Sequence, residues 1–290
     1  MAQSYVNKAQ MMNIGNIIIN YDITPSQMKN LQNIAGKDIR ILDRNGVIID
    51  IFNIHAKSNE SKKQVLLAKY EYILPRLTRQ WSHLERQMGG TGTRGGPGEK
   101  QIEIDRRLIR NEIVKLKKDL KKINLSKEVQ SKRRSGVFTI SLAGYTNAGK
   151  STIMNLLTGS SVYARNELFA TLDSTTRNLK LGTKEKAIIS DTIGFIQKLP
   201  HELIASFRTT LSDIKSSDYI IKVIDASYDN FPMHITTIDE TMESIQAAEI
   251  NSILLFNKVD LLSSDVLKSL MKRFPSSIFI SAKTKIGRDS

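Results

Sequence analysis

The sequence predicts an α/β protein in which a small N-terminal α/β unit carries a long antiparallel helical hairpin. A second domain with a mostly parallel, doubly wound sheet follows. Two stretches in the first half repeat apolar residues at steps of three and four, which is typical of packed helices. A glycine-rich segment separates these stretches. From residue 137 onward, apolar strand-like runs alternate with helical patterns, as in sheets built from strand–helix–strand units.

The composition is that of a soluble globular protein with 290 residues, 40% hydrophobic and 25% charged, which is long enough for two domains. No run approaches the ~18–20 apolar residues of a membrane span. Residues 1–13 lack the apolar core of a signal peptide, so we expect a cytoplasmic protein. The absence of cysteine excludes disulfides, thiolate zinc sites and cysteine nucleophiles, and four scattered histidines argue against a metal cage.

The net charge of +14, from 43 basic and 29 acidic residues, suits a polyanionic partner such as nucleic acid, a ribosome or an anionic membrane surface. The plain alternative is that lysines only keep the surface solvated. We favour the polyanion because the basic residues are clustered. The cluster comprises Lys115, Lys117, Lys118, Lys121, Lys122, Lys127, Lys132, Arg133 and Arg134.

The N-terminal unit is assigned to residues 1–60. An isoleucine-rich run at residues 16–21 predicts a buried strand. Thr24 and Pro25 then form a helix start, with threonine as the cap and proline at the first position. Residues 38–42 and 47–52 predict two further strands, joined by a hairpin turn at Asn45-Gly46.

Residues 61–125 predict the helical hairpin. Its first helix covers residues 61–88, where Pro75 should kink or split it. Its second helix covers residues 100–124 and presents an apolar seam to the first. The seam comprises Ile102, Ile109, Ile113, Leu116, Leu120 and Ile123.

The tip of this hairpin is the glycine-rich segment 89–98. Glycine there lets the backbone approach a partner closely, and Arg86 and Arg94 can meet RNA phosphates. The alternative is a connector without contacts. We favour the RNA contact because a plain helical hairpin needs only a few linking residues.

A polar linker at residues 126–135 separates the hairpin from the second domain, residues 136–290. The predicted strands are residues 178–181, 187–190, 219–224, 252–256 and 277–280. The predicted helices are residues 201–214, 233–248 and 265–272. The chain stops just after the last strand, so we expect this domain to be truncated at its C-terminal end.

The second domain opens with a phosphate-binding loop between a strand and a helix, which is the context that such a loop needs. Its N–H groups should cradle phosphate oxygens at a helix N-terminus. Lys150 would reach the β- and γ-phosphates, and the Ser151 hydroxyl would bind Mg²⁺. The loop reads Gly144-Tyr145-Thr146-Asn147-Ala148-Gly149-Lys150-Ser151.

Two later segments complete a nucleotide site. In Asp191-Thr192-Ile193-Gly194, the carboxylate can hold Mg²⁺ through water, and the glycine N–H can meet the γ-phosphate. In Asn257-Lys258-Val259-Asp260, the last carboxylate can accept two hydrogen bonds from guanine, whereas adenine would leave it unpaired. Ser281-Ala282-Lys283 can offer a backbone N–H to guanine O6. The expected ligands are therefore GTP or GDP with Mg²⁺.

Between these motifs, a threonine should give Mg²⁺ a second hydroxyl ligand and contact the γ-phosphate. On chemistry alone, Thr171, Thr175 and Thr176 all qualify. They lie in the segment Phe169-Ala170-Thr171-Leu172-Asp173-Ser174-Thr175-Thr176-Arg177. Arg177 could act as an arginine finger, but such a residue more often forms surface salt bridges.

The chain resembles the HflX family of ribosome-associated P-loop GTPases. The resemblance rests on Trp81-Ser82-His83-Leu84-Glu85-Arg86-Gln87, the glycine-rich tip with Gly96-Pro97-Gly98-Glu99, Asp105-Arg106-Arg107, and the segments 144–151 and 169–177. It implies that Thr171 is the Mg²⁺-binding threonine beside Ser151, and that Phe169, Ala170, Leu172 and Asp173 line the nucleotide. It also implies catalytic roles for Lys150, Thr171 and Gly194.

The resemblance further implies binding of the large (50S) ribosomal subunit and its RNA, in ribosome splitting, rescue or subunit maturation. Ras-like enzymes place a water-orienting glutamine where this chain has Phe195, so we expect slow GTP hydrolysis that ribosomes stimulate. Gln197 is near in sequence. The alternatives are an RNA-binding assembly factor that uses GTP only as a conformational ligand, and a peripheral membrane GTPase attracted by charge. We expect a monomer.

Overall fold

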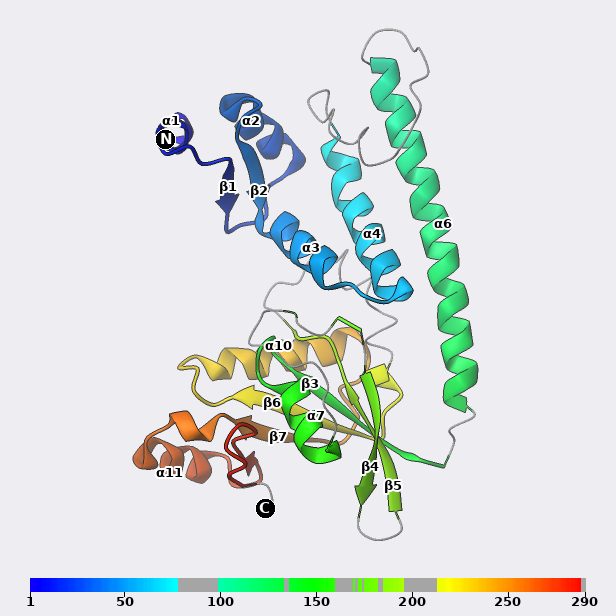
Figure 1. The fold of residues 1–290 in the computed structure, drawn as a ribbon, viewed down its shortest axis with the longest axis vertical. Helices are drawn as coiled ribbons and strands as arrows, with labels where there is room; N and C mark the ends of the chain where they lie inside the picture. The colour runs from blue at the N-terminus through cyan, green and yellow to red at the C-terminus, as the bar shows by residue number, and fades with distance from the viewer. Residues whose placement is uncertain are drawn as a thin grey trace. The chain divides into compact units, whose positions relative to one another are not determined.

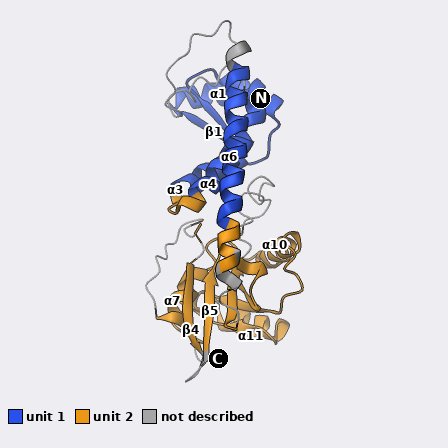
Figure 2. Cartoon of the chain, turned by 90° about the vertical axis from the view of Figure 1, so that its right-hand side faces the viewer, with its two compact units in different colours: residues 1–54, 62–123 blue, residues 55–61, 124–290 orange. Residues whose placement is uncertain are grey.

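The computed structural model describes residues 1–77, 99–132, 136–159, 169, 172–173, 175–181, 185–195 and 213–287. The chain divides into two compact units (Figure 2). Unit 1 comprises Met1–Ile54 and Lys62–Ile123, and unit 2 comprises His55–Ser61 and Asn124–Ser290. No helix in the described part of the chain is both long and apolar enough to cross a membrane.

Unit 1 begins with helix α1 (Ala2–Met11), which the polar N-terminal sequence did not indicate. A strand–helix–strand motif follows, in which β1 (Asn16–Ile19) and β2 (Arg40–Asp43) pair in parallel. Helix α2 (Pro25–Ala35) connects the two strands (Figure 1). The first predicted strand and the helix that follows it are therefore confirmed, but the expected burial of the strand is wrong, because its residues alternate between exposed and half-buried.

The start of α2 is capped as its sequence predicts. Thr24 Oγ1 accepts a hydrogen bond from the Gln27 N–H at 3.2 Å, and Gln27 Oε1 accepts one from the Thr24 N–H at 2.9 Å. This reciprocal pair satisfies two backbone donors that the first helical turn leaves free. Helices α1 and α2 and strand β2 then share one apolar core, formed by Val6, Ala9, Met28, Ala35, Ile39 and Ile41.

The predicted strand at residues 47–52 is wrong, because this stretch belongs to helix α3 (Arg44–His55). Its buried residues Ile48, Ile49 and Phe52 lie on one helical face, and a continuous apolar run suits a buried helix as well as a strand. Asp43 decides the outcome by accepting a hydrogen bond from the Gly46 N–H at 2.8 Å, as a helix cap does.

Asn45-Gly46 therefore lies in the first turn of α3 and does not form a hairpin turn. Gly46 is needed there for space, since a Cβ at this position would approach the Tyr72 hydroxyl to 2.9 Å.

Helix α4 (Asn59–Ile73) ends where the sequence places its break, because η1 (Leu74–Arg76), a short 3₁₀ turn, contains Pro75. Helix α6 (Glu99–Lys132) forms the second long helix. Its predicted seam is buried at Ile109, Ile113, Leu116 and Leu120.

Two ion pairs join the helices within unit 1, Lys63–Asp119 at 2.6 Å and Lys117–Glu71 at 2.7 Å. The predicted tip, 89–98, and the motif beginning at Trp81 lie outside the described residues.

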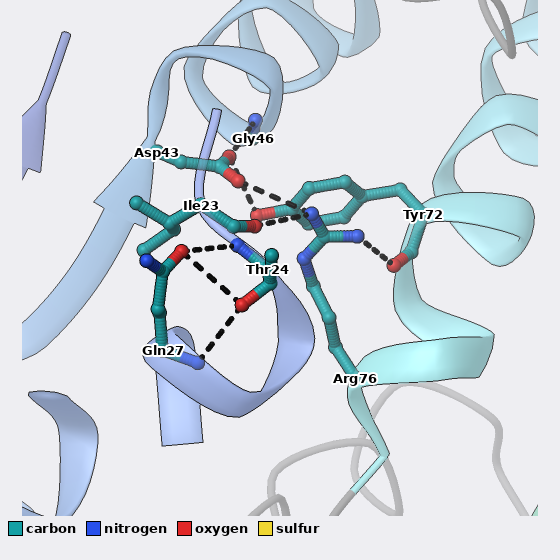
Figure 3. Close-up of polar contacts among 7 residues, drawn as sticks. All are labelled: Ile23, Thr24, Gln27, Asp43, Gly46, Tyr72 and Arg76. Atoms are coloured by element: carbon teal, nitrogen blue, oxygen red, sulfur yellow. Dashed lines mark hydrogen bonds and ion pairs between the residues drawn. The ribbon is translucent and has the colours of Figure 1, made fainter. Parts of the chain in front are cut away.

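A buried polar cluster links β2 to the end of α4 in unit 1 (Figure 3). Asp43 is fully buried, and its carboxylate accepts hydrogen bonds from the Tyr72 hydroxyl at 2.8 Å and from Arg76 Nη2 at 3.3 Å. Arg76 also donates to the backbone oxygens of Tyr72 and Ile23 at 3.0 and 3.1 Å. Burial, and then the neighbouring Asp43 charge, raise the pKa of Tyr72.

Unit 2 contains a six-stranded sheet in the order β4-β5-β3-β6-β7-β8. Only β4 is antiparallel to its neighbour, so the predicted mostly parallel sheet is confirmed. The strands are β3 (Phe138–Gly144), β4 (Thr175–Leu181), β5 (Glu185–Asp191), β6 (Tyr219–Asp225), β7 (Ser252–Asn257) and β8 (Ile278–Phe279).

Helices cover both faces of this sheet because neighbouring strand residues point to opposite sides. Helix α7 (Lys150–Thr158) packs on the face that contains Leu142 and Val223. Helices α10 (Phe231–Ser244) and α11 (Ser264–Arg273) pack on the face that contains Phe256. This is the predicted doubly wound arrangement. The predicted helix at residues 201–214 lies almost wholly outside the described residues.

Replacing Asp43 with alanine should lower the free energy of unfolding by about 3–5 kcal/mol, because it leaves the buried Tyr72 hydroxyl without its acceptor and the largely buried Arg76 guanidinium without its countercharge. Asp50 is a matched control, since it pairs with Arg40 at 3.4 Å on the exposed surface. Asp50→Ala should cost at most ~1 kcal/mol. Urea unfolding followed by circular dichroism measures both, and equal losses would contradict a special role for the buried cluster.

Candidate nucleotide site

The glycines at the two ends of the phosphate-binding loop are each required by a specific feature of the backbone or packing. Gly149 has a φ of +96°, and a Cβ there would lie 2.2 Å from Asn257 Nδ2. At Gly144, where β3 ends, a Cβ would lie 2.5 Å from the backbone oxygen of Val223 on β6. Glycine is therefore needed at Gly149 for backbone conformation and close approach, and at Gly144 for close packing between strands.

Lys150 begins helix α7 and is buried under the loop. Its Nζ donates hydrogen bonds to the backbone oxygens of Gly144 at 3.1 Å and Tyr145 at 3.0 Å. Burial lowers the pKa of Lys150 to about 8, against the opposing attraction of Asp191. The amine is therefore held inside the loop that the sequence assigns to the phosphates.

Two oxygen-bearing side chains meet where β5 ends beside β3. Ser151 Oγ donates a hydrogen bond to Asp191 Oδ2 at 2.5 Å, and Asp191 is fully buried. A hydroxyl and a carboxylate are hard oxygen donors of the kind that Mg²⁺ prefers. The two residues therefore fit a magnesium ion, although Thr171, the other predicted ligand, lies outside the described residues.

The segment from Asp191 to Gly194 packs directly against the phosphate-binding loop. The Thr146 N–H donates to the Phe195 oxygen at 2.8 Å, and the Phe195 N–H donates to the Gly144 oxygen at 3.0 Å. A Cβ on Gly194 would lie 2.7 Å from the Thr146 Cα. Glycine is therefore required at position 194 by close packing against Thr146, whereas contact of its N–H with the γ-phosphate stays a prediction.

Phe195 is 1% exposed, and its ring belongs to the apolar core beneath α10. It cannot hydrogen-bond a water molecule from there. Gln197, the neighbouring glutamine, is outside the described residues.

Parts of the 169–177 segment are described, and they too contact the loop. The Phe169 N–H donates to Thr146 Oγ1 at 2.9 Å, and Phe169 and Leu172 are buried. Ala170, Thr171 and Ser174 lie outside the described residues. Thr175 and Thr176 belong to β4 and pair with β5, and Arg177 is exposed.

Asn257, at the end of β7, connects the predicted base-binding segments, residues 257–260 and 281–283, to the phosphate-binding loop. Its Nδ2 donates to the Ala148 oxygen at 2.9 Å, and its Oδ1 accepts from the Ala282 N–H at 3.0 Å. Lys258 has a φ of +66° and pairs with Asp225 Oδ2 at 2.6 Å. Val259 and Asp260 begin η2 (Val259–Leu261), and Ser281 and Lys283 flank Ala282.

Two features of this site were not predicted from the sequence. Asp225 supports Lys258, and the signal available was an acidic residue at a strand end, as for Asp191. The other is a stack in which His234 lies between Tyr145 and Tyr228, with ring centroids 3.8 and 4.5 Å away. Burial lowers the pKa of His234, against the attraction of Asp225, which favours a neutral ring in the stack.

Comparisons with known proteins agree with this architecture. Three family models match in order: "GTP-binding GTPase N-terminal" over residues 2–53, "GTP-binding GTPase Middle Region" over 55–134, and "50S ribosome-binding GTPase" over 139–258. The GTPase HflX of Spirochaeta thermophila is 37% identical over 288 residues, and the match covers 99% of this chain and 70% of that protein. This chain belongs to the HflX family.

Other HflX proteins match at similar levels. GTPase HflX of Magnetococcus marinus is 41% identical over 93% of this chain and 62% of its own length. GTPase HflX of Escherichia coli is 40% identical over 93% of this chain and 64% of its own length. The chain therefore spans roughly three fifths to two thirds of these HflX relatives.

A solved structure described as an SsGBP and GDP complex has a TM-score of 0.52 and 25% identity, covering 99% of this chain and 81% of that one. A GTP-binding protein from Sulfolobus solfataricus, also with GDP, has a TM-score of 0.50 and 22% identity. It covers 99% of this chain and 81% of its own, and at this identity it supports the fold alone.

Lys150 provides a test of the site by proton uptake. Nucleotide phosphates favour the charged amine and should raise its pKa above the value of about 8 in the free protein. From about pH 8 toward the ordinary lysine value of 10.5, the complex then holds more protons than the free protein. Binding should take up protons there and weaken as pH rises.

Calorimetry of GDP binding at about pH 8.5, in buffers of different ionisation enthalpy, measures the uptake. Lys150→Arg should abolish it, because the guanidinium stays charged in both states. The exposed Lys186 is a control whose replacement by alanine should leave the uptake unchanged. Binding of GDP without any proton uptake would contradict contact between Lys150 and the phosphates.

Proposed function

We propose that this chain binds GTP with Mg²⁺ and hydrolyses it to GDP and phosphate. The observation that carries the proposal is one hydrogen-bonded network at the carboxyl ends of three parallel strands. Ser151 contacts Asp191, Thr146 contacts Phe195, and Asn257 contacts Ala148. Ligands of open α/β sheets bind at this edge, so a single nucleotide there can contact all three segments.

The phosphate-binding loop, Lys150 and the Gly194 N–H would bind and orient the phosphates. Ser151 and Thr171 would be the protein ligands of Mg²⁺, with Asp191 acting through water. Bound Mg²⁺ would neutralise charge on the β- and γ-phosphates. With Phe195 in the core, the chain has no glutamine at the Ras-like position to orient the attacking water, which supports a low intrinsic rate.

Guanine would be read by Asp260, with a backbone N–H of the 281–283 segment donating to O6. Lys283 is the candidate there, because the Ala282 N–H donates to Asn257 Oδ1 and the Ser281 N–H to the Ile286 oxygen. The contacts of Asn257 support this assignment, because they hold the loops of both residues to the phosphate-binding loop. Lys258 would cover the base with its aliphatic stem while Asp225 holds its amine.

The partner we propose is the large ribosomal subunit, in ribosome splitting, rescue or subunit maturation. The description of the matching family model, a 50S ribosome-binding GTPase, supports this proposal. Exposed lysines along α6 offer a surface for RNA phosphates. They are Lys115, Lys117, Lys118, Lys121 and Lys122, of which Lys115 and Lys117 also pair with Glu112 and Glu71. Residues 89–98 would contact ribosomal RNA.

Asp260→Asn should weaken GTP binding and favour xanthosine triphosphate, because the amide replaces one acceptor with a donor that matches the xanthine oxygen. We expect at least a tenfold loss for GTP, or about 1.4 kcal/mol. Asp265→Asn in the first turn of α11 is a control that should leave both affinities unchanged. Equal GTP affinity in wild type and Asp260→Asn would contradict guanine recognition by Asp260.

GTP turnover with and without large ribosomal subunits tests the function. We expect a low rate for the chain alone and at least a tenfold increase with subunits, or about 1.4 kcal/mol of barrier. Deleting residues 89–98 should remove the increase and leave nucleotide affinity intact. Turnover that subunits do not change would favour the alternative, an RNA-binding factor that uses GTP as a conformational ligand.

A further inference from the structure

A contact outside the nucleotide motifs holds the 169–177 segment. The Asp173 carboxylate accepts hydrogen bonds from Ser58 Oγ at 2.5 Å, from the Ser58 N–H at 3.1 Å and from the Lys57 N–H at 3.4 Å. Ser58 and Asp173 are 115 positions apart in sequence, and both belong to unit 2. Two backbone donors and one hydroxyl thus converge on a single carboxylate.

The Ser58 side of this contact is held by its own hydrogen bonds. Ser58 directly precedes α4, and its Oγ accepts from the Ser61 N–H at 3.0 Å, as a helix cap does. Ser61 Oγ returns a hydrogen bond to the Ser58 oxygen at 3.2 Å, and Ser61 is 1% exposed. The start of a helix also favours a negative charge, so this position suits a carboxylate.

The Asp173 side is equally constrained. Leu172 is 1% exposed, and Phe169 is bonded through its N–H to Thr146 Oγ1 in the phosphate-binding loop. The segment is therefore attached at Phe169 to the loop and at Asp173 to Ser58. Thr171, the predicted Mg²⁺ ligand, lies in sequence between these two attachments.

We propose that Ser58 is a positioning residue for binding of the GTP γ-phosphate, acting through Asp173. Fixing a backbone residue in one conformation costs conformational entropy. An attachment already present in the free protein removes part of that cost when the segment meets the γ-phosphate. The proposal rests on the proposed function, because the segment matters in this way only if GTP binds beside it.

The same helix start also contacts the end of α6. Lys127 pairs with both oxygens of the Glu60 carboxylate, at 2.8 and 2.9 Å. Glu60 lies in the first turn of α4, two residues after Ser58. The start of α4, which holds Asp173, is thus also paired with α6, the helix that carries the exposed lysines. The 169–177 segment is therefore connected to α6 through Ser58 and Glu60.

The test compares a non-hydrolysable GTP analogue with GDP, because GDP lacks the γ-phosphate that the segment would contact. Ser58→Ala removes the hydroxyl that donates to Asp173, at a residue outside the predicted nucleotide site. It should weaken binding of the analogue about five- to tenfold, the net effect of losing one hydrogen bond, and change GDP affinity less than twofold. Asp173→Ala should weaken binding of the analogue by a similar factor, and Ser58→Thr, which keeps a hydroxyl, should restore wild-type binding.

The double variant Ser58→Ala/Asp173→Ala should be no weaker than either single variant, because both remove one interaction. Thr24→Ala is a matched control that removes another helix cap, in unit 1, and should leave the analogue-to-GDP ratio unchanged. Three results would overturn this inference alone. They are equal losses of affinity for the analogue and for GDP, tighter binding of the analogue by a single variant, and additive losses of analogue affinity in the double variant. A wild-type chain that binds neither nucleotide would instead overturn the proposed function.

Discussion

The nucleotide site depends on the close approach of Asn257 to the phosphate-binding loop. Its buried amide donates to the Ala148 oxygen and accepts from the Ala282 N–H, so both ends are satisfied. This is possible only because Gly149 has no side chain, since a Cβ there would lie 2.2 Å from the amide nitrogen. One glycine thereby allows the loop proposed for phosphates and the loops proposed for the base to share a hydrogen-bonded support.

The order of the strands in the sheet of unit 2 brings the other charged groups of the site together. Because β5 and β6 both flank β3, the carboxyl ends of these three strands bring Asp191 and Asp225 to the edge where the phosphate-binding loop begins. Asp191 meets Ser151 there, and Asp225 meets Lys258. Residues on the two faces of the same strands build separate apolar cores, and Phe195 enters the core beneath α10. The Phe195 side chain is therefore in the core and not at the site, where Ras-like enzymes have the glutamine that orients water.

Unit 1 depends on a buried carboxylate. Asp43 ends β2, caps α3 through Gly46, and accepts from Tyr72 and Arg76 at the end of α4. A charge with no exposed surface is stabilising only when its partners are in place, so the strand, the two helices and the turn at Pro75 must form together. The end of α4 is consequently held to β2 and α3 by polar as well as apolar contacts.

The sequence by itself predicted the mostly parallel sheet, the cap at Thr24, the break at Pro75 and the positions of the nucleotide motifs. Each of these predictions depends on a pattern of residues that lie close together in the chain. Tertiary structure favoured a helix at residues 47–52, where a continuous apolar run suits either a buried strand or a helix, because Tyr72 and Arg76 hold Asp43 in place as the cap of α3. It also decided the contacts between His234 and Tyr145 and between Ser58 and Asp173. These pairs meet across the fold, and periodicity, capping and turn chemistry act only over short sequence separations.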